Sequence, residues 1–268
     1  MKMPFVLCGI LLLSACSPGA YRSTNKIYKK QVKEFARLIR EYPLTDSAGL
    51  PFAGQWVGAT NFGLRRPNVV VIHYTAQNSC GQTLKTFTTP ATQVSAHYVI
   101  CKDGTVHHML NDLLRAHHAG AGKWGNDTDL NSASIGIEID NNGSEIFTEQ
   151  QLVSLTTLLG RLKRTYNIPV ANFIGHSDLA PGRKVDPGNL FPWASLAQQG
   201  YGLWYDTSMV QLPVDFNPLL ALRVIGYNTR QPETAIRSFK LHYVPGDTSR
   251  VLSDGDLKIL FSLQGQTL

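Results

Sequence analysis

A continuous β-branched stretch is the feature that most constrains the fold. Residues 68–76 read NVVVIHYTA, with three valines and an isoleucine in a row before the histidine. A strand with one face in water alternates apolar and polar residues, whereas this stretch is apolar at successive positions. The sequence therefore predicts a strand that is buried on both of its faces.

Two further strands are predicted, at residues 94–101 and 134–140. The second reads SIGIEID and alternates strictly, so its three isoleucines point to one face. Gly136, Glu138 and Asp140 point to the opposite face. This alternation places a carboxylate on the face away from the isoleucines.

A helix is predicted after the third strand. Thr148-x-x-Gln151 has the form of a capping box, and the leucines that follow recur at helical spacing until Asn167-Ile168-Pro169. Strands mixed with helices predict an α/β domain over residues 51–205.

The character of the sequence changes after Trp204. Residues 206–268 contain three short apolar segments with helical periodicity, around residues 219–225, 236–243 and 257–263. Turn-forming residues at 226–228 and 245–247 separate them. We expect residues 206–268 to form a small helical domain.

The first residues predict export. MKMPFVLCGILLLSACSPG has a lysine at position 2, an apolar core over residues 5–13 and small residues after it, as signal peptides do. The apolar core is too short to span a bilayer. Residues 13–16, LSAC, resemble a bacterial lipobox, so we expect a lipoprotein signal peptide over residues 1–15 and lipidation at Cys16. The alternative is an ordinary secretory signal. Ser17 favours an outer-membrane lipoprotein that faces the periplasm.

Residues 16–50 are expected to form a tether and a basic helix. The segment 25–42 has Val32, Phe35, Leu38 and Ile39 on one side and several lysines and arginines elsewhere. Such a helix could lie on an anionic surface beside a lipid anchor. A helix packed on the domain or a solvated stalk is the interpretation that the sequence favours.

Charge and cysteine content narrow the possible partners. The chain has 25 Lys and Arg against 19 Asp and Glu, a net charge of +6, which suits an anionic partner in general. The sequence contains no run of six basic residues, which argues against nucleic-acid binding.

Two of the four cysteines, Cys8 and Cys16, belong to the export segment. Cys80 and Cys101 remain, and an oxidising compartment would permit a disulfide between them, although the sequence alone does not show that they are close.

Two histidines and a rigid loop suggest a metal site. His73 lies at the end of the buried strand, and His176 opens the loop GHSDLAPGRKVDPG at residues 175–188. The prolines and glycines in this loop predict irregular structure that is hardly helical. Two imidazoles and one carboxylate form a zinc site that keeps a fourth position open. The spacing leaves Asp178 and Asp186 both available as the third ligand, with Pro181-Gly182 able to turn the chain back.

Five blocks in order carry a family resemblance. They are VVIHYTA, SAHY at 95–98, HAG at 118–120, N-x-x-SIGIE at 131–138, and GHSDLAPGRKVDPG followed by LFPW. Together they resemble the zinc-dependent N-acetylmuramoyl-L-alanine amidases of the type-2 family, whose fold is shared with the peptidoglycan recognition proteins. The match covers residues 51–205, and the lipobox and C-terminal helices resemble the outer-membrane lipoprotein branch of that family. More loosely, residues 206–268 resemble a peptidoglycan-binding domain.

The resemblance implies a fold and a metal site. The fold is a central mixed sheet flanked by helices, and the cofactor is Zn²⁺. The implied ligands are His73, His176 and Asp186. Asp178 is then left with a loop or hydrogen-bonding role, and its replacement by alanine is expected to leave zinc retention largely intact.

The resemblance also implies catalytic and substrate-binding residues. Glu138 matches the catalytic acid/base, Lys184 the lysine on the oxyanion side, and Tyr98 a tyrosine of the site. His118 and Asn131 match the substrate groove. The implied reaction is hydrolysis of the amide between N-acetylmuramic acid and L-alanine in peptidoglycan or muropeptides, by a protein that we expect to be a monomer.

Two features depart from the pattern, and two other functions stay open. His117 replaces a tryptophan of the lipoprotein branch, and His107-His108 adds a second histidine pair that we expect to face solvent.

A non-catalytic peptidoglycan-binding protein is one alternative function. A zinc hydrolase for another amide, such as a peptide cross-link, is the other.

Overall fold

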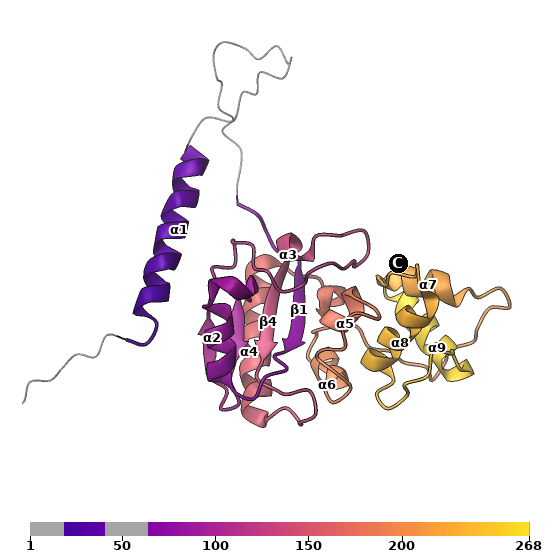
Figure 1. The fold of residues 1–268 in the computed structure, drawn as a ribbon. Helices are drawn as coiled ribbons and strands as arrows, with labels where there is room; N and C mark the ends of the chain where they lie inside the picture. The colour runs from indigo at the N-terminus through magenta and orange to yellow at the C-terminus, as the bar shows by residue number, and fades with distance from the viewer. Residues whose placement is uncertain (1–18, 41–63, 268) are drawn as a thin grey trace, which may run out of the picture. The chain divides into compact units, whose positions relative to one another are not determined.

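A five-stranded mixed sheet forms the centre of the C-terminal part of the chain (Figure 1). The computed structural model describes residues 19–40 and 64–267. In sequence order, the strands of these residues are β1 (Val69–Tyr74), β2 (Tyr98–Ile100), β3 (Val106–His108), β4 (Ser134–Ile139) and β5 (Phe173–Gly175). Their order in the sheet is β3-β2-β4-β1-β5, and only the β2–β3 pair is antiparallel. The predicted mixed sheet is therefore confirmed.

Helices of very different lengths are present among the described residues. The described residues form α1 (Arg22–Arg40), α2 (Cys80–Phe87), α3 (Leu130–Ala133), α4 (Glu149–Tyr166), α5 (His176–Leu179), α6 (Trp193–Gln198), α7 (Pro218–Ile225), α8 (Pro232–Tyr243) and α9 (Asp254–Gly265). The predicted capping box is present at the start of α4, where Thr148 and Gln151 each bond the other's backbone N–H. Asn167 ends α4 in the left-handed conformation.

The central strand β1 is buried on both faces, as its sequence predicts. On one face, Val70 and Ile72 join a hydrophobic cluster with the isoleucines of β4 and the leucines of α4. On the other face, Val69 and Val71 belong to a cluster that also contains Leu179 of α5 and residues of α7, α8 and α9. The three C-terminal helices predicted from periodicity are present, and they share a core with the sheet. The predicted boundary at residue 205 thus separates two parts of one compact unit.

A disulfide joins α2 to the end of β2. Cys80, the first residue of α2, is bonded to Cys101, and their Cα atoms lie 5.3 Å apart. His107 lies close to both sulfurs, but the sulfurs are bonded to each other and offer no thiolate to a metal.

The helix α1 belongs to a separate unit of the chain. It confirms the predicted basic helix, and all its residues are exposed or half-buried in the described segment 19–40. The predicted signal peptide, Cys8 and Cys16 lie outside the described residues. Among the helices that are described, none is long and apolar enough to cross a membrane.

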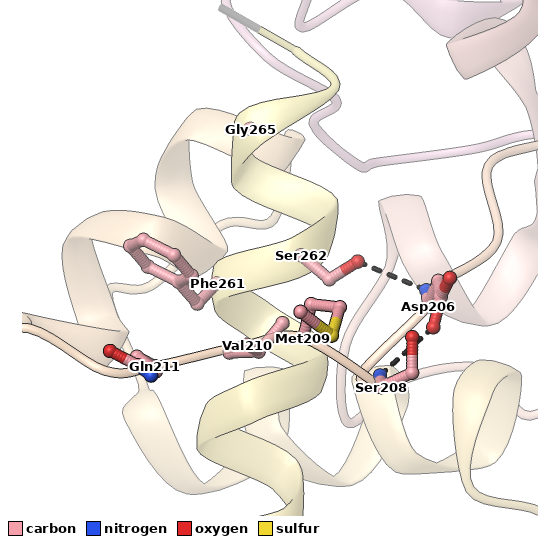
Figure 2. Close-up of a pocket in the computed structure, with 8 residues that line it drawn as sticks. All are labelled: Asp206, Ser208, Met209, Val210, Gln211, Phe261, Ser262 and Gly265. Carbon is pink, nitrogen blue, oxygen red and sulfur yellow. Dashed lines mark hydrogen bonds between the residues drawn. The ribbon is translucent and has the colours of Figure 1, made fainter.

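A groove of about 480 Å³ lies between the segment 206–211 and α9 (Figure 2). Met209, Val210 and Phe261 contribute apolar surface, and the hydroxyl of Ser262 accepts a hydrogen bond from the backbone N–H of Asp206. The groove is confined to the C-terminal part of the chain, and its lining contains none of the residues predicted to bind metal.

Candidate metal centre

Three neighbouring strands carry the site at their carboxyl ends. β1 is parallel to both β4 and β5, and the register of β1 and β4 pairs His73 with Glu138. Paired residues of adjacent strands point to the same face, so both side chains lie on the face opposite the isoleucines. His176 follows directly after β5 as the first residue of α5. Ligands of parallel sheets commonly bind at this edge.

The loop after α5 brings a carboxylate back to both histidines. The expectation that residues 175–188 are hardly helical was wrong for residues 176–179, which form the single turn α5 before Pro181. The chain then reverses, and Ser177 donates its backbone N–H to the carbonyl of Asp186. Asp186 Oδ2 lies 2.9 Å from His73 Nδ1 and 3.0 Å from His176 Nδ1. The structure thus groups Asp186, not Asp178, with the two histidines.

The outer ring nitrogen of His176 has its own partner. His176 Nε2 lies 2.9 Å from the carbonyl oxygen of Ala119, which can only accept a hydrogen bond. The proton of a neutral ring therefore lies on Nε2, and the Nδ1 lone pair faces Asp186. Arg183 donates to the same carbonyl at 2.7 Å and so supports it.

A chain of hydrogen bonds fixes His73 in the same way. The hydroxyl of Ser134 donates to the carbonyl of Leu130, so it must accept from His118 Nε2 at 3.2 Å. His118 Nδ1 is then an acceptor and receives the proton of His73 Nε2 at 3.0 Å. The Nδ1 lone pair of His73 is left facing Asp186.

Two lone pairs and a carboxylate oxygen therefore converge. The three ligand atoms lie within 4.8 Å of one another, and the side chains that carry them are buried. Three acceptors that face one another without a proton repel, and a cation removes that repulsion. Two neutral imidazoles with one carboxylate suit Zn²⁺ in a catalytic site, and hydrogen bonds to the outer ring nitrogens are the usual support of such ligands.

The pKa values of these groups agree with that charge pattern. Burial, together with the neighbouring His176, lowers the pKa of His73 to about 4. Burial alone would raise the pKa of Asp186, but the two imidazoles beside it, His176 and His73, outweigh burial and lower the pKa. At neutral pH the site thus holds a neutral His73 and an ionised Asp186, which are the forms that bind a metal.

Glu138 lies beside this group with an unsatisfied oxygen. Its Oε2 atom is buried and has no hydrogen-bond partner among the described residues. Burial and the negative charge of Asp186 raise the pKa of Glu138 well above the usual carboxyl value, while Lys184 acts in the opposite sense. A buried carboxyl with a raised pKa and a free oxygen is suited to accept and return a proton.

Lys184 lies between Asp178 and Asp186 in the sequence, and its side chain is exposed. Its positive charge is close enough to lower the pKa values of both His73 and Glu138. From its exposed position, the Lys184 side chain can therefore stabilise negative charge in the site.

The assignment of Tyr98 to the site is wrong in this structure. Tyr98 pairs with Ile137 in the sheet register, so it points to the face away from His73 and Glu138. Its ring packs in the hydrophobic cluster under α4, and its hydroxyl donates to Asp112 at 2.7 Å. The preceding residue, His97, points to the site face and accepts from the backbone N–H of Gly136.

The two predicted groove residues lie near the metal ligands but have internal partners. His118 bonds His73, as described above. The side-chain oxygen of Asn131 accepts from the backbone N–H groups of His118 and Ala119, at 3.0 and 2.9 Å. Asn131 therefore fixes the backbone of residues 118–119. The side chain of His118 bonds His73, and the carbonyl of Ala119 bonds His176.

Asp178 anchors α5 to the C-terminal helices. It is fully buried, and its carboxylate accepts from the backbone N–H of Gly175 at 2.7 Å and from the hydroxyl of Tyr227 at 2.8 Å. His242 Nδ1 lies 2.8 Å from the same carboxylate, and its ring stacks on Trp193. This network was not foreseen, because Tyr227 and His242 lie 49 and 64 residues further along the chain.

Comparison with known proteins identifies the family of the chain. The family model described as N-acetylmuramoyl-L-alanine amidase matches residues 63–189. N-acetylmuramoyl-L-alanine amidase AmiD of Escherichia coli is 34% identical over 212 residues, which cover 67% of this chain and 76% of that protein. The chain belongs to the type-2 N-acetylmuramoyl-L-alanine amidase family.

Other members of the family are also similar. The 1,6-anhydro-N-acetylmuramyl-L-alanine amidase AmpD of E. coli is 36% identical over 102 residues, 38% of this chain and 56% of that protein. Two solved structures match at 28% identity. AmiD in complex with anhydro-N-acetylmuramic acid-L-Ala-D-gamma-Glu-L-Lys has a TM-score of 0.68 and covers 78% of this chain and 93% of its own. AmpDh3 of Pseudomonas aeruginosa has a TM-score of 0.69 and covers 81% and 98%.

Replacing Ser134 with alanine tests the hydrogen-bond chain behind His73. We expect Zn²⁺ affinity to fall by about 10- to 100-fold, because His118 loses the acceptor that fixes its orientation. A competition titration with a chelating dye measures this. Ser154→Ala is the matched control, since that hydroxyl donates to the carbonyl of Gly104 away from the site. Equal affinities for both variants would contradict the assignment.

Asp186→Ala and Asp178→Ala should fail in different ways. Asp186→Ala should fold but lose bound metal. Asp178→Ala leaves three buried groups without an acceptor, so we expect the free energy of unfolding to fall by about 3 kcal/mol or more. Chemical denaturation and metal analysis separate the two effects, and Asp178→Asn retains most of the side-chain volume. A fully stable Asp178→Ala protein would show that the network contributes nothing.

Proposed function

We propose that the chain hydrolyses the amide between N-acetylmuramic acid and L-alanine in peptidoglycan or muropeptides, with Zn²⁺ bound by His73, His176 and Asp186. The observation that carries the proposal is the convergence of two imidazole lone pairs and a carboxylate beside Glu138, whose Oε2 atom has no partner in the described part of the chain. The amidase names of the relatives and the muropeptide in the AmiD complex support this substrate class.

The residues of the site divide the chemistry among them. When bound, Zn²⁺ supplies Lewis acidity toward the amide carbonyl and lowers the pKa of water. Glu138 accepts the proton of the attacking water and returns it to the leaving amine nitrogen. Lys184 stabilises negative charge on the carbonyl oxygen as the carbon becomes tetrahedral.

We also propose that the protein is an exported lipoprotein, with Cys16 lipidated and the catalytic unit facing the periplasm from the outer membrane. The LSAC sequence before residue 17 supports lipidation. The disulfide between Cys80 and Cys101 supports an oxidising compartment. A monomer is sufficient for the proposed activity, because all the proposed site residues come from one chain.

Glu138→Gln tests the proposed reaction. We expect kcat to fall by about 10²- to 10⁴-fold with zinc retained, because glutamine cannot carry the proton. Mass spectrometry of muropeptide digests should show intact stem peptides that begin with L-alanine for the wild type. The control is Glu145→Gln, which removes a carboxylate paired with Lys102 instead.

The pH profile of the wild type gives a second measure of the same residue. The base form of Glu138 is lost as the pH falls through its raised pKa, so kcat/KM should decline on the acid side at a pH above the usual carboxyl range. Wall binding without product release would favour the non-catalytic alternative. Cleaved peptide cross-links would favour the other zinc hydrolase.

Cys16→Ser tests the proposed anchor. Radiolabelled palmitate should be incorporated into the wild-type chain and not into Cys16→Ser, because acylation needs that thiol. Cys8→Ser is the control and should remain labelled. Label on the Cys16→Ser chain, or none on the wild type, would leave an ordinary secretory signal as the better description.

A further inference from the structure

The helix α1 carries the net charge of the whole protein. Its 19 residues contain seven basic side chains and one acidic side chain, Glu34, for a net charge of +6. The chain as a whole has 25 basic and 19 acidic residues, so the remainder has 18 of each and is neutral. The positive charge that the composition shows is thus concentrated in one helix.

The apolar residues of α1 share one side of the helix. Phe35 lies three and four residues from Val32 and Ile39, and Leu38 lies three residues from Phe35, so these side chains meet on one face. They are 37% (Val32), 48% (Phe35), 50% (Leu38) and 73% (Ile39) exposed. Lys26, Lys30, Lys33 and Arg37 recur at the same spacing on the opposite face.

We propose that α1 binds the surface of an anionic phospholipid bilayer, with its apolar face in the interface and its basic side chains among the headgroups. Basic amphipathic helices with aromatic and aliphatic residues on one face bind in this way. Anionic headgroups neutralise the +6 charge, and the acyl region covers side chains that are exposed in the described segment 19–40.

The charge argues against other partners for this face. Two copies of α1 packed through their apolar sides would bring two +6 helices together, and like charges at that distance repel. A nucleic acid would neutralise the basic side chains but leave Phe35, Leu38 and Ile39 in water. An anionic lipid surface is the partner that satisfies both faces at once.

The position of α1 in the chain suits this role. Only residues 17–21 separate Cys16 from the start of the helix. If Cys16 is lipidated, as proposed above, the helix begins within about 20 Å of the membrane. The binding proposed for α1 does not itself depend on lipidation, so the two ideas can fail separately.

Vesicle binding by the full chain tests the inference. Cys16→Ser removes the lipid and serves as the starting protein. We expect it to sediment with vesicles of 70% phosphatidylcholine and 30% phosphatidylglycerol more strongly than with pure phosphatidylcholine, and less so at 500 mM salt. Adding Lys29→Glu, Lys30→Glu and Lys33→Glu should weaken binding to the anionic vesicles by about 100-fold, since each basic side chain near such a surface contributes about fivefold. Phe35→Ala with Leu38→Ala should weaken it at least about tenfold.

A matched charge change elsewhere is the control. Lys85→Glu, Arg164→Glu and Lys258→Glu alter the net charge by the same amount at exposed positions outside α1 and should leave the vesicle affinity of the starting protein within about threefold. All variants should cleave soluble muropeptides equally, which shows that they are folded. Equal loss in both charge variants, or unchanged vesicle binding in the α1 variants, overturns the inference. So does a dimer that the Phe35→Ala, Leu38→Ala variant abolishes while its vesicle binding is unchanged.

Discussion

The structure depends on burying β1 on both of its faces. The leucines of α4 cover one face together with the isoleucines of β4. The other face belongs to a cluster that continues through α5 into the C-terminal helices. Because His73 is the fifth residue of this strand, the packing that stabilises the domain also fixes the direction of a proposed ligand. The rigidity that a metal site needs thus comes from the core.

Proton placement is the second organising principle of the site. Each imidazole donates the hydrogen bond of its outer N–H away from Asp186. His176 donates to the Ala119 carbonyl. His73 donates to His118, which donates to Ser134, which donates to the Leu130 carbonyl. In the neutral rings, the two nitrogens that face Asp186 therefore carry lone pairs. The buried carboxylate of Asp186 completes the group, and Glu138 remains outside it with an oxygen that bonds none of the residues described in the structure.

Local sequence patterns predicted several strands and helices, whereas the arrangement of the site depends on strand pairing, on the path of the loop and on contacts between distant residues. The run of β-branched residues predicted β1, and the capping box predicted the start of α4. Spacing could not choose between Asp178 and Asp186, because the path of the loop decides which carboxylate returns to His176. Neighbouring residues of a strand, such as His97 and Tyr98, point in opposite directions, but only the pairing of Tyr98 with Ile137 shows which of the two faces the site. The sequence could not predict the bonds from Tyr227 and His242 to Asp178, because these residues lie 49 and 64 positions further along the chain, one after α7 and the other in α8.

The bonds from Tyr227 and His242 to Asp178 connect the C-terminal segment to the helix α5, which begins with His176. A shortened enzyme cut near residue 205 would lose two of the three partners of a buried carboxylate that lies two residues from His176. Loss of activity in such a truncation would not measure a contribution to wall binding. Likewise, a chimera that exchanges these helices for those of a relative would have to carry over a hydroxyl and an imidazole in register with α5.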